Sequence, residues 1–348
     1  MPALSSAKST WFSSEALWIV LVIAAAYGIV PLAGTDYLLD AVLTPFLALS
    51  LAAVGLNVLT GYAGQVSLGS AAFLAVGAYA AYNLHLRIPA LPLLIDLVMA
   101  GGVAAAIGIV FGLPSLRLRG FYLAVSTLAA QFFVQWALTK FSWFSNDNPS
   151  GVIDAPILSI GGISFTTPAE RYVLSLTIVV VLTILTLRLL RSQSGRNFIA
   201  VRDHEIAAKV IGVPLLRTKL LAFAISSFLI GVAGVLWAFA YLRTVEPAGF
   251  NLDRSFQILF IIIIGGLASL RGSFIGAAFI VVFPLLLSRI GAALLGSMFD
   301  SGVLEMSQRI VIGGLIIAFL IAEPRGLVAL WDRAWATIRP ARRSARPI

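Results

Sequence analysis

From Ser192 to Thr218 the chain reads SQSGRNFIAVRDHEIAAKVIGVPLLRT, a polar and basic interval between two long apolar runs at 171–190 and 219–241. About 20 apolar residues in a helix cross the ~30 Å hydrocarbon core of a bilayer, and each run reaches that length. A backbone inside lipid must satisfy its own hydrogen bonds, so each run is predicted to be a transmembrane helix. The polar interval is then a connection on one side of the membrane.

The composition extends this prediction to the whole chain. The 348 residues are 60% hydrophobic and 11% charged, whereas soluble domains carry about 25% charged residues. The apolar runs are continuous rather than alternating, which excludes a β-barrel. The expected fold is therefore all-α: one polytopic integral membrane helical bundle over residues 1–348. The chain has no cysteine and only two histidines, far apart, so no catalytic, cofactor-binding or metal-binding residues are predicted.

The apolar runs predict about ten transmembrane helices. Five lie before the long polar connection near residue 150 and five after it. Their expected ranges are 16–33, 38–59, 67–86, 91–116, 121–138, 171–190, 219–241, 255–268, 273–290 and 306–322.

The distribution of charge predicts the orientation of these spans. With ten spans, the basic segments before the first span, between the fourth and fifth, at 191–218 and at 323–348 all fall on one side, which the positive-inside rule makes cytoplasmic. Both termini are then cytoplasmic, 191–218 is a cytoplasmic loop and 323–348 a basic cytoplasmic tail. The 141–168 loop is extracytoplasmic. The net charge of +9 is attributed to orientation and contact with anionic membrane lipid rather than to nucleic acid.

The basic loop contains the signals of a short helix. Asp203 is a good N-cap, Glu205 places an acid in the first turn, and Gly212 followed by Pro214 ends the helix. Within these limits one face is apolar, formed by Ile206, Ala207, Val210 and Ile211. Such a helix has two possible roles. It is either part of a basic loop that only sets the orientation of the protein in the membrane, or a docking surface for another protein. The spacing alone leaves both alternatives open.

A second unusual stretch reads GLNVLTGYAGQVSLGS from Gly55 to Ser70. It is either a cytoplasmic turn between two spans or a broken, re-entrant helix whose freed backbone lines a water-filled path. The stretch at 265–276, GGLASLRGSFIG, has a similar pattern of small residues. The polar and glycine positions of the first stretch, with two glutamines four apart on a later span, are the predicted translocation-pathway residues: Asn57, Gly61, Gly64, Gln65, Ser67, Gly69, Gln131 and Gln135.

Three stretches carry a family resemblance. The Gly55–Ser70 stretch with Gly77-Ala-Tyr79, the segment GRNFIAVRDHEIAAKVIGV from Gly195 to Val213, and Glu323-Pro-Arg-Gly-Leu327 resemble the branched-chain amino-acid ABC transporter permeases of the LivM type. The resemblance covers nearly the whole chain. It departs from the importers' Glu-Ala-Ala…Gly coupling motif by placing Ile206 after Glu205.

The resemblance implies a function and a set of partners. Such permeases pair with a homologous LivH-type permease, two LivG/LivF-type ATPase subunits and a periplasmic or lipid-anchored substrate-binding protein. They reside in the bacterial inner membrane as multi-pass proteins and import leucine, isoleucine and valine, or in relatives urea, short amides or other amino acids. ATP and Mg are expected on the ATPase partners. The implied ATPase-coupling residues are Arg196, Arg202, Asp203, Glu205, Ala207, Ala208 and Gly212.

The residues themselves agree with an external energy source. The chain contains no Gly-x-x-x-x-Gly-Lys-Ser/Thr phosphate loop and no array of intramembrane carboxylates of the kind used by ion-coupled pumps. A permease subunit that is not itself an enzyme is therefore expected. A stand-alone channel or secondary carrier is the alternative from another class.

Overall fold

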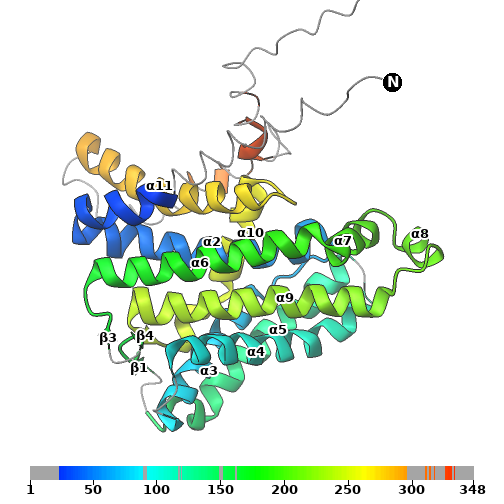
Figure 1. The fold of residues 1–348 in the computed structure, drawn as a ribbon, viewed down its shortest axis with the longest axis horizontal. Helices are drawn as coiled ribbons and strands as arrows, with labels where there is room; N and C mark the ends of the chain where they lie inside the picture. Colours follow the sequence, from blue (N-terminus) through cyan, green and yellow to red (C-terminus); the bar gives the residue numbers. More distant parts are fainter. Residues whose placement is uncertain are drawn as a thin grey trace, which may run out of the picture.

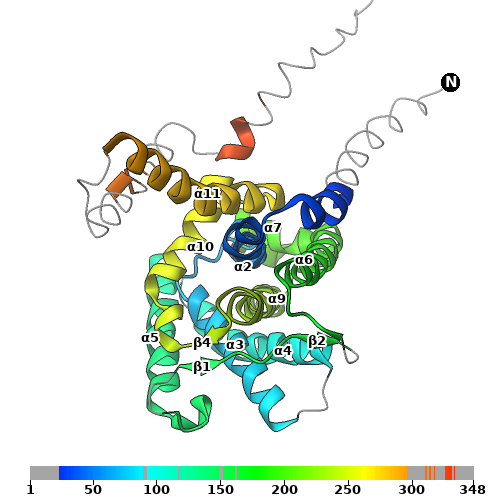
Figure 2. The same cartoon turned by 90° about the vertical axis from the view of Figure 1, so that its left-hand side faces the viewer.

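Two continuous helical segments form the centre of the bundle in the computed structural model, where Figure 2 shows both end-on. The first consists of α2 (Thr44–Asn57) flanked by the π-helices η1 (Leu38–Leu43) and η2 (Val58–Tyr62). The second is α9 (Leu215–Val235) continued by the π-helix η5 (Leu236–Leu242). In their most apolar windows 83% and 72% of residues are buried, against 33–39% in the other long apolar helices. These two segments are therefore the core around which the rest packs.

The remaining long helices surround this core (Figure 2). The structure describes residues 23–88, 92–116, 118, 120–148, 152–160, 163–295, 310–311, 313–314, 317, 326–330 and 333. The surrounding helices are α3 (Ser70–Arg87), α4 (Leu93–Gly112), α5 (Phe121–Lys140), α6 (Pro168–Arg191), α10 (Leu252–Gly265) and α11 (Leu270–Leu295), with a shorter helix at Ile23–Ala33.

The two ends of the bundle differ (Figure 1). One end, called the basic end below, carries the short helices α7 (Gln193–Asp203) and α8 (Glu205–Val210). The opposite end, called the strand end, carries two antiparallel strand pairs. These are β1 (Ile153–Asp154) with β4 (Thr244–Val245), and β2 (Ser159–Ile160) with β3 (Ile163–Ser164). Single 3₁₀ turns complete the connections: η3 (Leu113–Leu116), η4 (Ser142–Ser145) and η6 (Pro247–Phe250).

Local sequence signals explain where several helices begin. At the start of α6, the Thr167 side chain accepts a hydrogen bond from the Glu170 amide, and the Glu170 carboxylate accepts one from the Thr167 amide. This capping box, followed by Pro168 in the first turn, fixes the start of the helix. Asn251 caps α10 by accepting a hydrogen bond from the Arg254 amide. The connections at the strand end are thereby attached at defined points to α6 and α10.

Glycines allow the core helices to approach closely. A Cβ atom at Gly77 of α3 would lie 2.1 Å from the carbonyl oxygen of Gly231 in α9, and one at Gly234 would lie 2.0 Å from the carbonyl oxygen of Leu74. Lipid provides no hydrophobic driving force between helices, so close backbone contact is a principal source of their association. These glycines therefore serve the packing of α3 against α9.

The predicted spans match most of the observed helices. Seven helical segments among the described residues have the length and hydropathy of membrane spans, and α3 occupies the position of the predicted span at 67–86. Most of the predicted span at 306–322 and residues 16–22 of the span at 16–33 lie outside the described residues. The count of ten and the cytoplasmic placement of the termini therefore stay predictions.

The predicted helix between Asp203 and Gly212 is corrected by the structure. Asp203 is the last residue of α7 rather than an N-cap, and His204, with φ −152° and ψ 94°, interrupts the helix before α8 begins. The helix α8 has His204 at its N-cap position and no side-chain cap, whereas the preceding helix α7 is capped by the Ser192 hydroxyl, which accepts a hydrogen bond from the Ser194 amide. The stop at Gly212 is confirmed, because its φ of +89° lies in the region that favours glycine.

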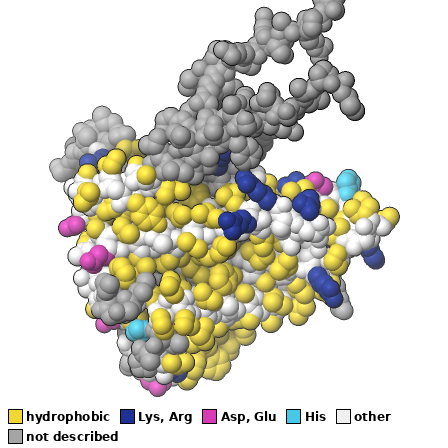
Figure 3. Space-filling view, in the orientation of Figure 1, with side chains coloured by type: hydrophobic (Ala, Val, Ile, Leu, Met, Phe, Trp, Pro, Cys, Tyr) yellow, Lys and Arg dark blue, Asp and Glu magenta, His cyan; other side chains and the backbone are white. Residues whose placement is uncertain are grey.

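The surface agrees with a membrane-embedded bundle (Figure 3). Hydrophobic side chains cover much of the visible middle of the molecule, Lys and Arg lie mainly toward the basic end, and several acidic side chains lie at the strand end. The exposed apolar side chains include Val98 of α4, Phe133 of α5 and Leu185 of α6. Faces of this kind are stable in contact with lipid.

The α3–α9 contact can be tested by adding one methyl group. Replacing Gly77 by alanine should lower the thermal unfolding midpoint of the purified protein, because overpacking costs about 1–3 kcal/mol. Gly102→Ala is the matched control, since no atom lies within 4 Å of a Cβ placed there. The control should be neutral or stabilising by up to about 1 kcal/mol through helix propensity. Equal midpoints for the two variants would contradict the packing assignment.

Candidate functional site

The chain leaves helical structure at Ala63 and resumes it at Ser70. Gln65 and Ser67 are buried in this interval, and neither amide atom of the Gln65 side chain has a hydrogen-bond partner among the described residues. The Leu68 amide donates to the Thr127 hydroxyl at 2.9 Å, and Thr127 is the seventh residue of α5. The interval is thus packed inside protein alongside a span, which favours the broken-helix alternative over a solvent-exposed turn.

Asn57 connects this break to a second one, between α10 and α11. Its Nδ2 atom donates to the Ser269 carbonyl at 2.9 Å and to the Ser273 hydroxyl at 3.0 Å, while its Oδ1 accepts from the Ala268 amide at 2.8 Å. Asn57 is fully buried. The two glycine-rich stretches that resemble each other in sequence therefore lie side by side, held by one side chain.

The first break also contacts α7. The Arg202 Nη1 atom donates to the Gly61 carbonyl at 2.9 Å, and a Cβ atom at Gly64 would lie 2.7 Å from the Arg202 side chain. Gly64 has a φ of +68°, so both its backbone and its surroundings require glycine. Three predicted residues from two distant motifs thus meet in one junction, called the break–coupling junction below.

The short helix α8 is tied to α9. The Lys219 Nζ and Glu205 Oε1 atoms lie 2.8 Å apart, and the Lys219 side chain is only 6% exposed. Arg202 also pairs with Asp203 at 2.8 Å in a largely exposed position. A buried, short ion pair orients its partners more firmly than an exposed one. Glu205 therefore links the end of the α7–α8 segment to the central helix.

One face of α8 is open in the described chain. Ile206, Val210 and Ile211 are 75%, 82% and 74% exposed, and Ala207 is exposed beside them, whereas Ala208 is buried. The predicted apolar face therefore exists and is exposed, and α8 itself lies at the edge of the basic end (Figure 1). Contiguous exposed apolar residues between charged ones are typical of a protein-binding surface.

Gln131 forms a second polar connection, near the middle of α5. Its Oε1 accepts hydrogen bonds from the Ala72 amide and, at 3.3 Å, from the Ser255 hydroxyl, while its Nε2 donates to the Phe250 carbonyl at 2.8 Å. Gln131 is the eleventh of the twenty residues of α5. The first turns of α3 and α10 consequently meet at about the mid-height of a span. Gly69 packs at the same place, against the Thr127 carbonyl.

Two predicted residues lie apart from these connections. Arg196 is exposed on α7, where its guanidinium donates to the Gln193 side chain at 2.9 Å. Gln135 is half-buried one turn beyond Gln131, and its carbonyl accepts a hydrogen bond from the Thr139 hydroxyl. The structure brings neither side chain to the break–coupling junction.

The strand end contains an ion cluster that the sequence did not reveal. Asp40 lies 3.2 Å from Arg171 Nη2 and 2.7 Å from Arg243 Nη2. Arg171 is buried, whereas Arg243 is exposed. The three residues come from the starts or ends of separate spans, so no local pattern predicts their meeting. The cluster joins the outer ends of η1, α6 and η5.

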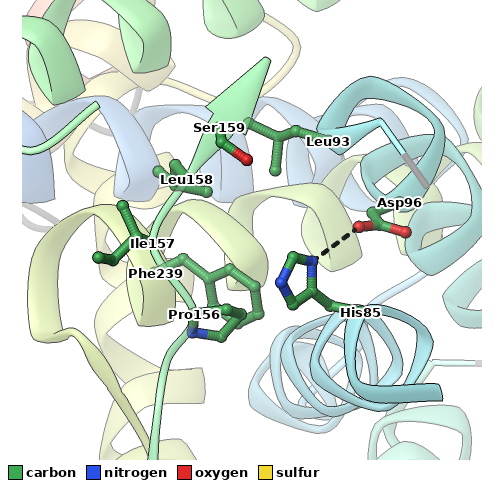
Figure 4. A pocket seen from close by; sticks show the side chains of 8 residues that line it. All are labelled: His85, Leu93, Asp96, Pro156, Ile157, Leu158, Ser159 and Phe239. Carbon is green, nitrogen blue, oxygen red and sulfur yellow. Dashed lines mark ion pairs between the residues drawn. The ribbon is translucent and has the colours of Figure 1, made fainter. Parts of the chain in front are cut away.

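A small pocket lies at the same end (Figure 4). His85 of α3 and Asp96 of α4 face each other there, with 3.5 Å between Nδ1 and Oδ2. Asp96 lies in the first turn of its helix and is buried. Pro156, Ile157 and Phe239 contribute apolar walls. Among the described residues no group of three or more potential metal ligands occurs, so His85 and Asp96 have no third ligand beside them there.

The fold and this site define a polytopic helical membrane protein whose spans are interrupted by hydrogen-bonded polar breaks. Residues 38–320 match the family described as "Branched-chain amino acid transport system / permease component", and the chain belongs to this family. It is accordingly a permease component of ABC-type transport, a class that works with ATPase and substrate-binding partners. The resemblance inferred from the motifs is confirmed.

Individual relatives support the assignment. The chain is 31% identical over 300 residues to the high-affinity branched-chain amino acid transport permease LivM of Salmonella typhimurium, covering 80% of this chain and 67% of the relative. The LivM protein of Escherichia coli has the same identity and coverage. The L-arabinose permease AraH of E. coli is 23% identical over 327 residues, 92% of this chain and 94% of AraH. No solved structure is significantly similar to the chain.

The junction at Asn57 can be tested through stability. Asn57→Leu should lower the thermal unfolding midpoint and speed hydrogen exchange across residues 266–273, because buried polar groups left without partners cost about 1–3 kcal/mol each. Thr139→Val removes one exposed hydroxyl at similar shape and serves as the control. If Asn57→Leu behaved like the control, the side chain would not be holding the two breaks together.

Proposed function

We propose that the chain is the translocation-pathway subunit of an importer for leucine, isoleucine and valine, driven by separate ATPase subunits that bind α8. The observation that carries the proposal is the placement of α8. Its apolar face is open, while its first residue is tied to the central helix by the Glu205–Lys219 pair. A segment with one exposed face and a fixed attachment to the core can transmit a displacement from a bound partner to the bundle.

Two connections lead into the bundle from α7 and α8, which together are called the coupling segment below. Glu205 leads to α9, and Arg202 leads to the break at Gly61 and, through Asn57, to the α10–α11 break. Closure of the ATPase subunits would shift α7 and α8, and these contacts would move the two breaks together with α9. Helix breaks are the points at which a bundle changes shape without losing the helices on either side.

The polar break supplies a pathway for a zwitterion. Gln65, Ser67, Gly61 and Gly69 are buried on a non-helical or loosely wound backbone, and Gly64 lies exposed between them. Irregular backbone at membrane depth is tolerated where it is buried in protein or lines a water-filled cavity. The unpartnered amide of Gln65 supports its assignment to the pathway, since a polar group that lacks an internal partner is available to water or solute. Asn57, Gln131 and Gln135 would border the same path.

The proposed assembly follows the family. A homologous LivH-type permease would complete the pathway, and two LivG/LivF-type ATPases would bind ATP and Mg at the basic end. A substrate-binding protein would dock at the strand end, where the 141–168 loop lies. The protein would cross the bacterial inner membrane about ten times, with the basic tail at 323–348 cytoplasmic beside anionic lipid. Branched-chain amino acids are proposed ahead of sugars because the LivM relatives are 31% identical to this chain and the arabinose permease AraH is 23% identical. Urea, short amides or other amino acids are the alternative substrates.

The apolar face of α8 gives the first test. Ile206→Asp should reduce co-purification of the ATPase subunits about tenfold or more, because a carboxylate would be buried without a partner in the interface. Ile157→Asp is the control, since Ile157 is 64% exposed at the opposite end. Normal ATPase recovery with Ile206→Asp would assign α8 to orientation alone, as would leucine uptake by the reconstituted chain without ATPases.

The Gln65 amide gives a second test. Gln65→Leu should slow leucine uptake about tenfold or more in proteoliposomes of the complete transporter, while the thermal midpoint stays equal or rises. Stability is preserved because replacing an unpaired buried polar group by an apolar one of similar shape is neutral or stabilising. A fall in stability that matches the fall in uptake would mean that Gln65 is structural. Unchanged uptake would remove it from the pathway.

A further inference from the structure

Arg254 is a partly buried cation within the bundle. It lies in the first turn of α10, and the adjacent Ser255 hydroxyl is bonded to Gln131 at about the mid-height of α5. None of the ion pairs among the described residues includes Arg254, and even the neighbouring Asp253 forms none with it. Charged residues at membrane depth are costly unless they are paired or face a water-filled path, so this position calls for a function.

The guanidinium is held in a defined orientation. Its Cζ atom lies 4.1 Å above the ring centre of Trp237, and its Nη1 donates to the side-chain oxygen of Gln257. Stacking and one hydrogen bond fix the plane of the group. The Nε atom is buried without an acceptor among the described residues. The hydrogen bond that the guanidinium donates there comes from Nη1, and Nη2 donates none. One edge of the guanidinium, Nε with Nη2, is therefore oriented but unoccupied.

A second unpaired donor lies beside it. Trp237 is 5% exposed, and its Nε1 has no acceptor among the described residues. Tyr241 packs against the Trp237 ring with 4.8 Å between ring centres. Trp237 and Tyr241 both belong to the π-helix η5, a rare form that occurs frequently at functional sites. Two buried donors next to each other, with no acceptor for either, are matched to an anionic group.

We propose that Arg254, backed by Trp237 and oriented by Gln257, binds the carboxylate of the amino acid as it passes through the transporter. The free Nε and Nη2 edge has the spacing of a carboxylate's two oxygens and can bind it bidentately. The inference rests on the proposed import function and narrows it to solutes that carry a carboxylate. Urea, short amides and sugars lack that group and would pass this position without the pairing.

Differential labelling tests the site without altering the protein. The complete transporter is placed in phosphatidylcholine nanodiscs and treated with the arginine reagent phenylglyoxal, and modification of Arg254 is measured by peptide mass spectrometry. Leucine and isovalerate, which carry a carboxylate, should each reduce labelling about tenfold at saturation. Isoamylamine, which lacks one, should leave labelling unchanged. Arg188, exposed on α6, is the internal reference.

The other possible anions give different results, and each overturns the proposal. An Arg254 that stays unlabelled with and without ligand would be covered by a carboxylate of the partner permease. Labelling that falls when phosphatidylglycerol is added, irrespective of leucine, would indicate a lipid phosphate. Equal labelling in the presence of isovalerate and isoamylamine would mean that no carboxylate site exists.

Substitutions test the role in transport. Arg254→Gln should lower leucine uptake about tenfold or more while the ATP hydrolysis stimulated by the loaded binding protein stays within about twofold. Arg254→Lys should recover part of the uptake, because it keeps the charge but not the bidentate geometry, and Arg188→Gln should match wild type. If wild type imports leucine and Arg254→Gln imports it at the same rate, this inference is overturned while the proposed function stands. Absence of leucine import by wild type would overturn the proposed function, and protection by isovalerate would still test the carboxylate site.

Discussion

A polar backbone group that leaves its helix inside a membrane must find a partner within the protein, and the arrangement of this bundle follows from that requirement. The chain breaks its helices at 63–69 and between α10 and α11, and Asn57 satisfies groups from the second break with a single side chain. Gln131 does the same for the first turns of α3 and α10. Without these two amides, groups of the second break and of the first turns of α3 and α10 would lose their partners.

The same contacts also join the basic end of the bundle to both helix breaks. Arg202 reaches from α7 to the carbonyl of Gly61, four residues beyond Asn57, so the basic end and the two breaks form one continuous set of contacts. The glycines at 61 and 64 leave room for that approach, because a side chain at either position would collide with its neighbours. Small residues here are thus required by the contact between two segments, which is a stronger constraint than flexibility.

The sequence predicted much of the fold because its main signals are local. Continuous apolar runs identified eight of the described helices to within a few residues, and Gly212 marked a true helix end. Asp203 was misassigned because an acid before an apolar pattern is typical of an N-cap, while in the structure Asp203 ends α7 and His204 stands before α8. The contacts of Asn57 with Ser269, of Asp40 with Arg243 and of Arg254 with Trp237 join distant segments. The spacing of residues within a single stretch of sequence carries no information about contacts between separate segments.

These distant contacts place the two proposed activities on one element. The segment Leu215–Leu242 is a continuous helix of 28 residues. Lys219, near its start, is held by Glu205 of the coupling segment, and Trp237, near its end, supports the guanidinium of Arg254. At 1.5 Å per residue the two contacts are about 27 Å apart along a helix that is largely buried. Because a packed helix moves as a unit, a displacement imposed at Lys219 reaches Trp237, where the wider turns of η5 can change register without breaking the helix. In the proposed mechanism, a push at the basic end would therefore alter the surface against which Arg254 is stacked, and nucleotide-driven motion would thereby be coupled to release of the carboxylate.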